Sequence, residues 1–270
     1  MYEIRLLIAF AATFLAAIED AKTSFIDDRL LYAMIIAGVV LNLLYPEAIV
    51  AAFAGALVIG VLGFFLWRSG QFGSGDVLLF IGLHLLLPAS LNSIVPFPVV
   101  SIFVASSFFA SIGSSLLFAM RLFAFRKKIM PWKKLAFGVL ILVLAVVLLA
   151  LGFSVIQKAF FFLLVSSLVF SALFMKEVMD FVVVRKITLK EMEDEDVLAL
   201  DKMPAWLVKK YSLGKLLDKA MRQKLALVVK KEKIRRFPVC KELPRFGPYV
   251  LAALAWFILF GDLVAFVFLS

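Results

Sequence analysis

Two aspartates in this sequence have the positions expected of a catalytic pair. Asp20 ends the first apolar run, and Asp76 follows the turn Gly73-Ser74-Gly75 at the start of another apolar run. Two carboxyl groups that share a proton can hydrolyse an amide bond, because the neutral one donates a hydrogen bond while the ionised one activates water. This chemistry requires no metal ion and no cofactor, so we expect neither. Asp20 and Asp76 are therefore the predicted catalytic residues.

The ends of the predicted helices suggest which aspartate carries the proton first. Asp20 lies at the C-terminal, negative end of a helix, where the neutral acid is favoured. Asp76 lies at the N-terminal, positive end of another predicted helix, where the anion is favoured. We expect Asp20 to be the initial acid and Asp76 the initial base, within a pair that titrates as a unit.

The residues around the two aspartates suggest how a substrate is held. Gly73 and Gly75, which flank Ser74, permit positive φ and leave no Cβ in the way. A substrate strand can therefore approach this turn closely, and we expect all three residues to orient it.

Three further acids form a rim near Asp20. Glu19, Asp27 and Asp28 either attract a basic peptide or are simply solvated charges. The sequence leaves both interpretations open.

The composition is that of a polytopic membrane protein. Of the 270 residues, 64% are hydrophobic, and the mean hydropathy is +1.06, far above the values of soluble domains. A carboxylate in such a segment is energetically expensive, so it is a functional hypothesis by default. The single cysteine, Cys240, excludes an intrachain disulfide. The N-terminal run lacks a basic start and a cleavage site, so we expect a retained span.

Eight apolar runs are long enough, or nearly long enough, to cross a bilayer. They cover residues 4–18, 30–45, 48–67, 76–87, 97–120, 135–152, 155–175 and 248–269. The predicted fold class is an all-α polytopic membrane protein of about eight transmembrane helices, with a small cytosolic α+β segment before the last span.

The basic residues predict the orientation of these spans. They gather in alternate short connections, which the positive-inside rule places in the cytosol. This group comprises Lys22, Arg29, Arg68, Arg121, Arg126, Lys127, Lys128, Lys133 and Lys134. The connections on the opposite side are expected to contain only Arg5 and Lys158. The formal net charge of +10 thus indicates membrane orientation, with no nucleic-acid partner expected. Both aspartates then face the cytosol, in a multi-pass protein of the plasma membrane.

Changes in composition divide the chain into four parts. Residues 1–120 form the predicted catalytic membrane core, 121–175 a basic loop and an additional pair of spans, 176–247 a basic cytosolic segment, and 248–270 the last span. Within 176–247, residues 181–184 and 225–229 are strand-like, and 205–225 have helical spacing. The basic residues of this segment bind either anionic membrane lipid or the substrate.

Both motifs resemble those of one family of membrane proteases. Asp20-Ala21-Lys22-Thr23-Ser24-Phe25-Ile26-Asp27-Asp28 is similar to the Asp-x-Lys-x-x-x-Ile-x-Asn/Asp pattern of type IV prepilin peptidases and archaeal preflagellin peptidases. Gly73-Ser74-Gly75-Asp76 matches their Gly-x-Gly-Asp signature. The resemblance covers residues 1–120, and more faintly the last span after 244–248. It implies an aspartic endopeptidase that removes basic leader peptides from type IV pilin-like or archaellin precursors at the cytosolic membrane face, with Asp20 and Asp76 as the catalytic pair. Glu19, Asp27 and Asp28 are then possible leader-binding residues.

Departures from the bacterial pattern point to the archaeal branch. Bacterial members usually have a lysine where this chain has Leu78, and often read Ile-Pro-Asn where it has Ile26-Asp27-Asp28. We expect no cysteine-bearing methyltransferase region of the kind found in bacterial members. Presenilin-like proteases share the Gly-x-Gly-Asp element, but a tyrosine normally precedes their first aspartate, and here Glu19 does.

Two other classes of protein fit parts of the sequence. The acidic pair could bind protons or cations in a coupled membrane carrier, although carrier sites typically lie near the bilayer midplane. The protein could also be a scaffold whose cytosolic segment binds partners. His84, the single histidine, and Asp262, deep in the last span, are expected to lie apart from the chemistry as interior and outer-interface residues.

Overall fold

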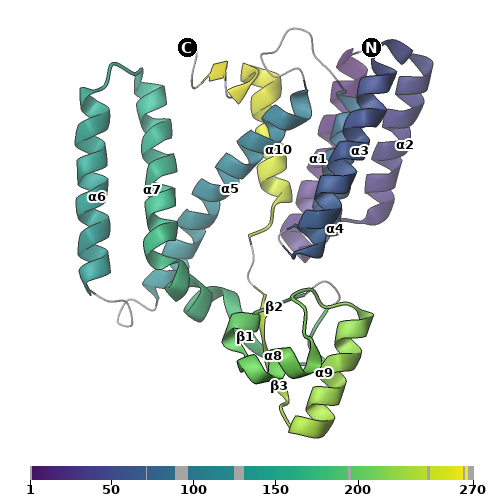
Figure 1. The fold of residues 1–270 in the computed structure, drawn as a ribbon. Helices are drawn as coiled ribbons and strands as arrows, with labels where there is room; N and C mark the ends of the chain where they lie inside the picture. The colour runs from purple at the N-terminus through teal and green to yellow at the C-terminus, as the bar shows by residue number, and fades with distance from the viewer. Residues whose placement is uncertain are drawn as a thin grey trace. The chain divides into compact units, whose positions relative to one another are not determined.

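The chain is predominantly helical in a computed structural model (Figure 1). The described residues are 2–70, 72–88, 97–124, 131–193, 196–241, 244–263 and 265–266. A helix forms at each of the eight predicted apolar runs. These helices are α1 (Tyr2–Thr23), α2 (Asp28–Leu44), α3 (Ile49–Arg68), α4 (Ser74–Leu86), α5 (Pro98–Phe123), α6 (Pro131–Ala150), α7 (Val155–Val178) and α10 (Gly247–Phe260).

Four helical segments among the described residues are long and apolar enough to cross a membrane. They are Pro46–Arg68, Pro98–Leu122, Trp132–Ala150 and Val155–Val183. Their large apolar side chains stay exposed, as for Val50 at 78% and Leu149 at 76%, and a lipid environment accounts for such surfaces. The protein is thus an all-α multi-pass membrane protein with a small sheet. The count of eight spans stays a prediction, because α1, α2, α4 and α10 are not among these four segments, and α4 and α10 are shorter apolar helices.

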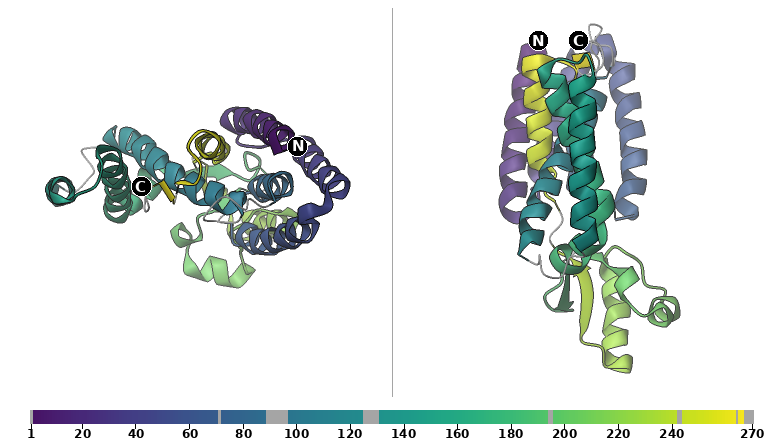
Figure 2. Two further views of the ribbon diagram at one scale, coloured as in Figure 1. Left: turned by 90° about the horizontal axis from the view of Figure 1, so that it is seen from above. Right: turned by 90° about the vertical axis from the view of Figure 1, so that its left-hand side faces the viewer.

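The chain forms two compact units, residues 1–110 with 244–270, and residues 111–243. In the first unit α4 packs against α1, α2 and α3, while α10 packs against α1 (Figure 2). The core side chains of α4, among them Leu79, Leu83 and Leu86, are fully buried. Gly38 of α2 allows this packing, because a Cβ there would lie 2.6 Å from Leu85 Cβ. Helix α4 is therefore the inner helix that carries Asp76.

Helix α4 ends inside the bundle, and two polar side chains satisfy its last carbonyl groups. Its 13 residues span about 20 Å, less than the roughly 30 Å hydrocarbon core of a bilayer. Asn42 Nδ2 donates to the Leu85 carbonyl oxygen at 2.7 Å, and Arg5 Nη1 contacts the Leu85 and Leu86 carbonyl oxygens at 3.5 Å. Arg5 Nη1 also donates to Asn42 Oδ1 at 3.0 Å. Arg5, which the sequence places in a connection, is in fact buried in the bundle.

Serine hydroxyls join α5 to α7 in the second unit. Ser167 Oγ lies 2.9 Å from Ser111 Oγ and 2.8 Å from Ser115 Oγ. Hydroxyl pairs of this kind hold helices together in lipid, where apolar contact alone gives little preference. Helix α7 begins with a capping box, in which Gln157 N donates to Ser154 Oγ and Ser154 N donates to Gln157 Oε1.

A small α+β domain continues directly from α7. The strands β1 (Val184–Thr188), β2 (Val197–Leu198) and β3 (Arg236–Cys240) form an antiparallel sheet in the order β1-β3-β2. Helices α8 (Ala205–Tyr211) and α9 (Lys219–Glu232) complete the domain (Figure 1). The core contains Leu207, Met221, Leu225, Val228 and Phe237.

Three local predictions within this domain were wrong. The segment 181–184 is not a strand, since a π-helical turn covers Met179–Val183 and the strand starts at Val184. The segment 225–229 lies in α9, because the buried Met221, Leu225 and Val228 repeat at helical spacing. The helix expected over 205–225 is two helices, separated where Ser212 adopts a left-handed conformation with φ of 47°.

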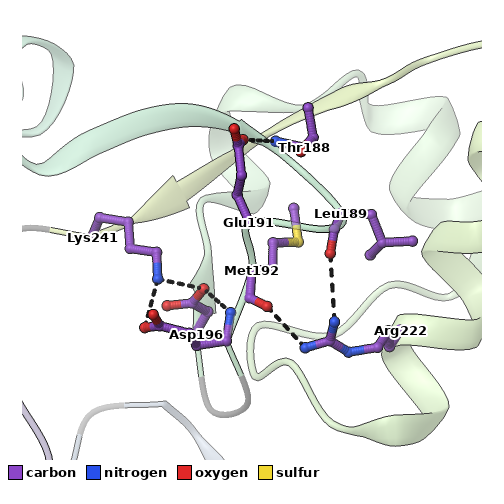
Figure 3. Close-up of polar contacts among 8 residues, drawn as sticks. Thr188, Leu189, Glu191, Met192, Asp196, Arg222 and Lys241 are labelled. Carbon is purple, nitrogen blue, oxygen red and sulfur yellow. Dashed lines mark hydrogen bonds and ion pairs between the residues drawn. The ribbon is translucent and has the colours of Figure 1, made fainter.

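The acidic stretch after β1 is tied to the rest of the small domain (Figure 3). Lys241 Nζ lies 2.9 Å from Glu193 Oε2 and 3.0 Å from Asp196 Oδ2. Arg222 Nη2 donates to the Met192 carbonyl oxygen at 3.0 Å, and Thr188 N donates to Glu191 Oε2 at 2.8 Å. The carboxylates of Glu191, Glu193 and Asp196 therefore stabilise the loop between β1 and β2. Asp194 and Glu195 lie outside the described residues.

Candidate active site

Asp20 lies in the last turn of α1 and is 7% exposed. Its Oδ2 accepts a hydrogen bond of 2.8 Å from the backbone N–H of Gly247, at the start of α10. Helix α1 ends just beyond it at Thr23, and Ser24 then takes a positive φ of 63° that turns the chain toward α2. The carboxylate is thus held between the end of one helix and the start of another.

Gly247 has no room for a side chain. A Cβ at this position would lie 3.0 Å from Asp20 Oδ2, 3.1 Å from Asp20 Cβ and 3.3 Å from Ala17 Cα. Sequence reasoning missed this partner of Asp20. A glycine and a proline at the start of an apolar helix, Gly247 and Pro248, are the available signal, because proline is favoured in the first helical turn.

Asp76 is the third residue of α4 and is half-buried. Its Oδ2 accepts a long hydrogen bond of 3.4 Å from the N–H of Gly73, the residue that caps the helix. Ser74 is the first helical residue. The positive φ that glycine permits is not used at Gly73, whose φ is −73°. A Cβ at Gly73 would instead lie 3.2 Å from Asp76 Oδ2, so glycine here leaves space for the carboxylate.

The two motifs meet at Ile26 and Gly75. A Cβ on Gly75 would lie 3.6 Å from Ile26 Cβ and 3.8 Å from Leu31 Cδ1, which is van der Waals contact distance. Ile26 follows Asp20 in the first motif, and Gly75 directly precedes Asp76 in the second. The C-terminal end of α1 and the N-terminal end of α4 therefore lie at one end of the same bundle.

Aromatic rings connect this end of the bundle to α10. Phe246 packs edge-to-face on Phe72, with ring centroids 5.3 Å apart, and lies 6.1 Å from Phe80. Phe103 of α5 contacts the same two rings, at 6.1 Å from Phe72 and 5.3 Å from Phe80. Phe72 precedes the glycine turn, and Phe80 lies one helical turn beyond Asp76. The start of α10, which binds Asp20 through Gly247, thus also packs through Phe246 against the segment that carries Asp76.

Two of the three rim acids have local structural contacts. Glu19 Oε2 accepts from Asp27 N at 2.9 Å, and Asp27 Oδ1 accepts from Arg29 N at 2.9 Å, which caps α2. Asp28 is exposed as the first residue of α2. These contacts fix the loop between α1 and α2.

The other titratable residues that the sequence analysis noted lie elsewhere in the first unit. His84 is 1% exposed, and its Nε2 lies 3.2 Å from the Ala51 carbonyl oxygen, as expected of an interior residue. Asp262 Oδ1 accepts from Ser101 Oγ at 2.8 Å. Within the described part of the chain, no group of three or more His, Cys, Asp or Glu side chains could hold a metal ion.

The part of the chain that contains both aspartate motifs matches a known protein family. Residues 7–119 match the type IV leader peptidase family. The match confirms the family resemblance of the sequence motifs and indicates a membrane protease of the leader peptidase type. No curated protein and no solved structure gave a significant match to the chain. Gly247 and the rest of α10 lie outside the matched region.

Proposed function

We propose that this protein is a membrane aspartic endopeptidase that removes basic leader peptides from type IV pilin-like or archaellin precursors at the cytosolic membrane face. The observation that carries the proposal is that Ile26 lies beside Gly75, so that the two aspartate motifs are at one end of a bundle. The match of residues 7–119 to the leader peptidase family supports the type of reaction and the class of substrate.

In the proposed reaction, the precursor's scissile bond lies between Asp20 and Asp76. Ionised Asp76 takes a proton from a water molecule, and the water oxygen attacks the carbonyl carbon. Protonated Asp20 gives its proton to the carbonyl oxygen, which yields a gem-diol. The carbon–nitrogen bond then breaks, one hydroxyl proton returns to Asp20, and the proton on Asp76 passes to the leaving amine. The products are the leader with a free carboxylate and the mature chain with a free amine.

Residues around Asp20 and Asp76 bind the substrate in this proposal. Gly73, Ser74 and Gly75 orient the substrate strand, and the exposed Asp28 attracts the positive charges of the leader. The basic small domain lies against anionic lipid headgroups of the membrane.

The substrate class is tested with a purified precursor that has a basic leader joined to an apolar helix. We expect the wild-type protein in detergent to release the leader as one product, seen by mass spectrometry. A matched precursor with its leader Lys and Arg residues changed to Gln should show a raised KM, because its attraction to the acidic rim is lost. No cleavage of several such precursors by folded protein would overturn the proposal.

A further inference from the structure

The start of α10 joins the segments that carry the two aspartates. Gly247 N donates to Asp20 Oδ2 at 2.8 Å, across 227 residues of sequence, and both residues are buried. One residue earlier, Phe246 packs on Phe72 and Phe80, which flank Asp76 on its own chain segment. A two-residue stretch therefore contacts both sides of the candidate active site.

The contact at Gly247 is close enough to set the position of Asp20. The absent Cβ of Gly247 would meet both Oδ2 and Cβ of Asp20 at 3.0 and 3.1 Å, as well as the Ala17 backbone at 3.3 Å. Because the backbone of α1 is one of these neighbours, a side chain at 247 can be accommodated only if Asp20 or a helix moves. The backbone N–H of Gly247 donates to Oδ2 of Asp20. Oδ1 of Asp20 is therefore the oxygen that carries the proton in the proposed reaction.

A second bond fixes the segment just before α10. Arg245 Nε donates to Ser24 Oγ at 3.1 Å, in the turn that ends α1. The start of α10 is thus attached to the C-terminal end of α1 at two residues, Asp20 and Ser24.

We propose that Gly247 and Phe246 are positioning residues for the peptidase reaction, an inference that rests on the proposed function. The backbone N–H of Gly247 holds the Asp20 carboxylate in place. Phe246 fixes the position of Gly247 relative to α4, the helix that carries Asp76. Neither residue touches the reacting atoms. Their effect is on the geometry of the pair, and misplacement by about 1 Å can cost roughly 100-fold in rate.

The test compares Gly247→Ala and Phe246→Leu with Gly138→Ala, a helical glycine in α6 whose added Cβ would meet nothing within 4 Å. We expect Gly247→Ala to lower kcat for precursor cleavage by about tenfold with KM nearly unchanged, because a Cβ at these distances displaces Asp20 by only a fraction of an ångström. Phe246→Leu keeps the backbone N–H and should lower kcat less, and Gly138→Ala should match wild type. Wild-type kcat in folded Gly247→Ala, or an effect on KM alone, would overturn the proposal. If Gly247→Ala does not fold, a wild-type kcat in Phe246→Leu would overturn the proposal instead.

A second readout does not depend on activity, so it separates this inference from the proposed function. A membrane-permeable carbodiimide labels accessible carboxyl groups, and mass spectrometry locates the label. We expect Asp20 to be labelled slowly in wild type and in Gly138→Ala, and several times faster in Gly247→Ala and Phe246→Leu. Equal labelling of all four proteins would overturn the positioning role, even if no precursor were cleaved. A wild type that labels slowly but cleaves nothing would contradict only the proposed function.

Discussion

At the residue scale, the two aspartates have different surroundings although they belong to one proposed pair. Asp20 is buried and accepts a 2.8 Å hydrogen bond from another helix, whereas half-buried Asp76 accepts a 3.4 Å bond from its own helix cap. Environments that differ in this way allow two carboxyl groups to take different roles in one reaction. We propose, from the greater burial of Asp20, that it is the initial acid and Asp76 the initial base.

The two glycines of the turn should affect different kinetic constants. In Gly73→Ala the new Cβ presses on Asp76 Oδ2, so we expect kcat to fall by about tenfold or more, because the base is displaced. In Gly75→Ala the new Cβ lies at ordinary contact distance from Ile26 but takes up space that we assign to the substrate. We expect that variant to raise KM and to keep kcat. Steady-state cleavage kinetics check both, and equal effects of the two variants on kcat would contradict the assignment.

At the element scale, the two ends of the short helix α4 have different surroundings and different roles. Its N-terminal end presents Asp76, and its C-terminal end is buried where Arg5 and Asn42 bind the Leu85 and Leu86 carbonyl oxygens. Unsatisfied carbonyl groups at such a depth would be costly, because no water is present to bind them. A polar network distant from the site thus lets a short helix stay inside the bundle.

Loss of this network should reduce stability without changing the chemistry. Arg5→Met keeps much of the side-chain volume but leaves the Leu86 carbonyl oxygen without its arginine, so we expect a loss of about 2 kcal/mol in the free energy of unfolding. Lys22→Met, at the exposed end of the same helix, is the matched control and should lose little. Unfolding in a denaturing detergent measures both. Equal stability of Arg5→Met and wild type would show that the network has no such role.

At the scale of the whole molecule, the proposed site and the small domain belong to different compact units. The chain leaves the first unit after residue 110 and returns to it at residue 244. Part of the proposed site, at Phe246 and Gly247, therefore comes from the end of the chain, beyond the region that matches the leader peptidase family. The second unit has its own core and the single cysteine, Cys240.

Cys240 should report on the folding of the second unit. Burial, followed by the negative charges of Asp201 and Asp196, raises the pKa of its thiol. We expect slow alkylation at pH 8 in the native protein and fast alkylation after denaturation, because little thiolate is present and access is blocked. The raised pKa contributes stability below the unfolded thiol's pKa, and this contribution is lost as the pH rises through the folded value. Equal alkylation rates before and after denaturation would contradict the buried position.

Much of this arrangement could be predicted from the sequence, because hydropathy and short motifs are local signals. The eight apolar runs form helices, and both aspartates lie at helix ends as expected. The partner of Asp20 could not be predicted, since Gly247 bonds through its backbone from 227 residues away. Arg5 was placed outside the bundle because charge alone does not reveal carbonyl groups that need a donor. In 225–229 the β-branched residues suggested a strand, although the spacing of Met221, Leu225 and Val228 was helical.

The measurement that tests the central claim most directly is the cleavage of a pilin-like precursor by wild type, Asp20→Asn and Asp76→Asn. Asp201→Asn, at an exposed surface position of the small domain, is the control for loss of one carboxylate. With each protein shown to be folded, we expect wild type and Asp201→Asn to release the leader and both active-site variants to lose at least about 1,000-fold in rate, the loss expected when an essential catalytic group is removed. Near-wild-type cleavage by Asp20→Asn or Asp76→Asn would contradict the catalytic pair.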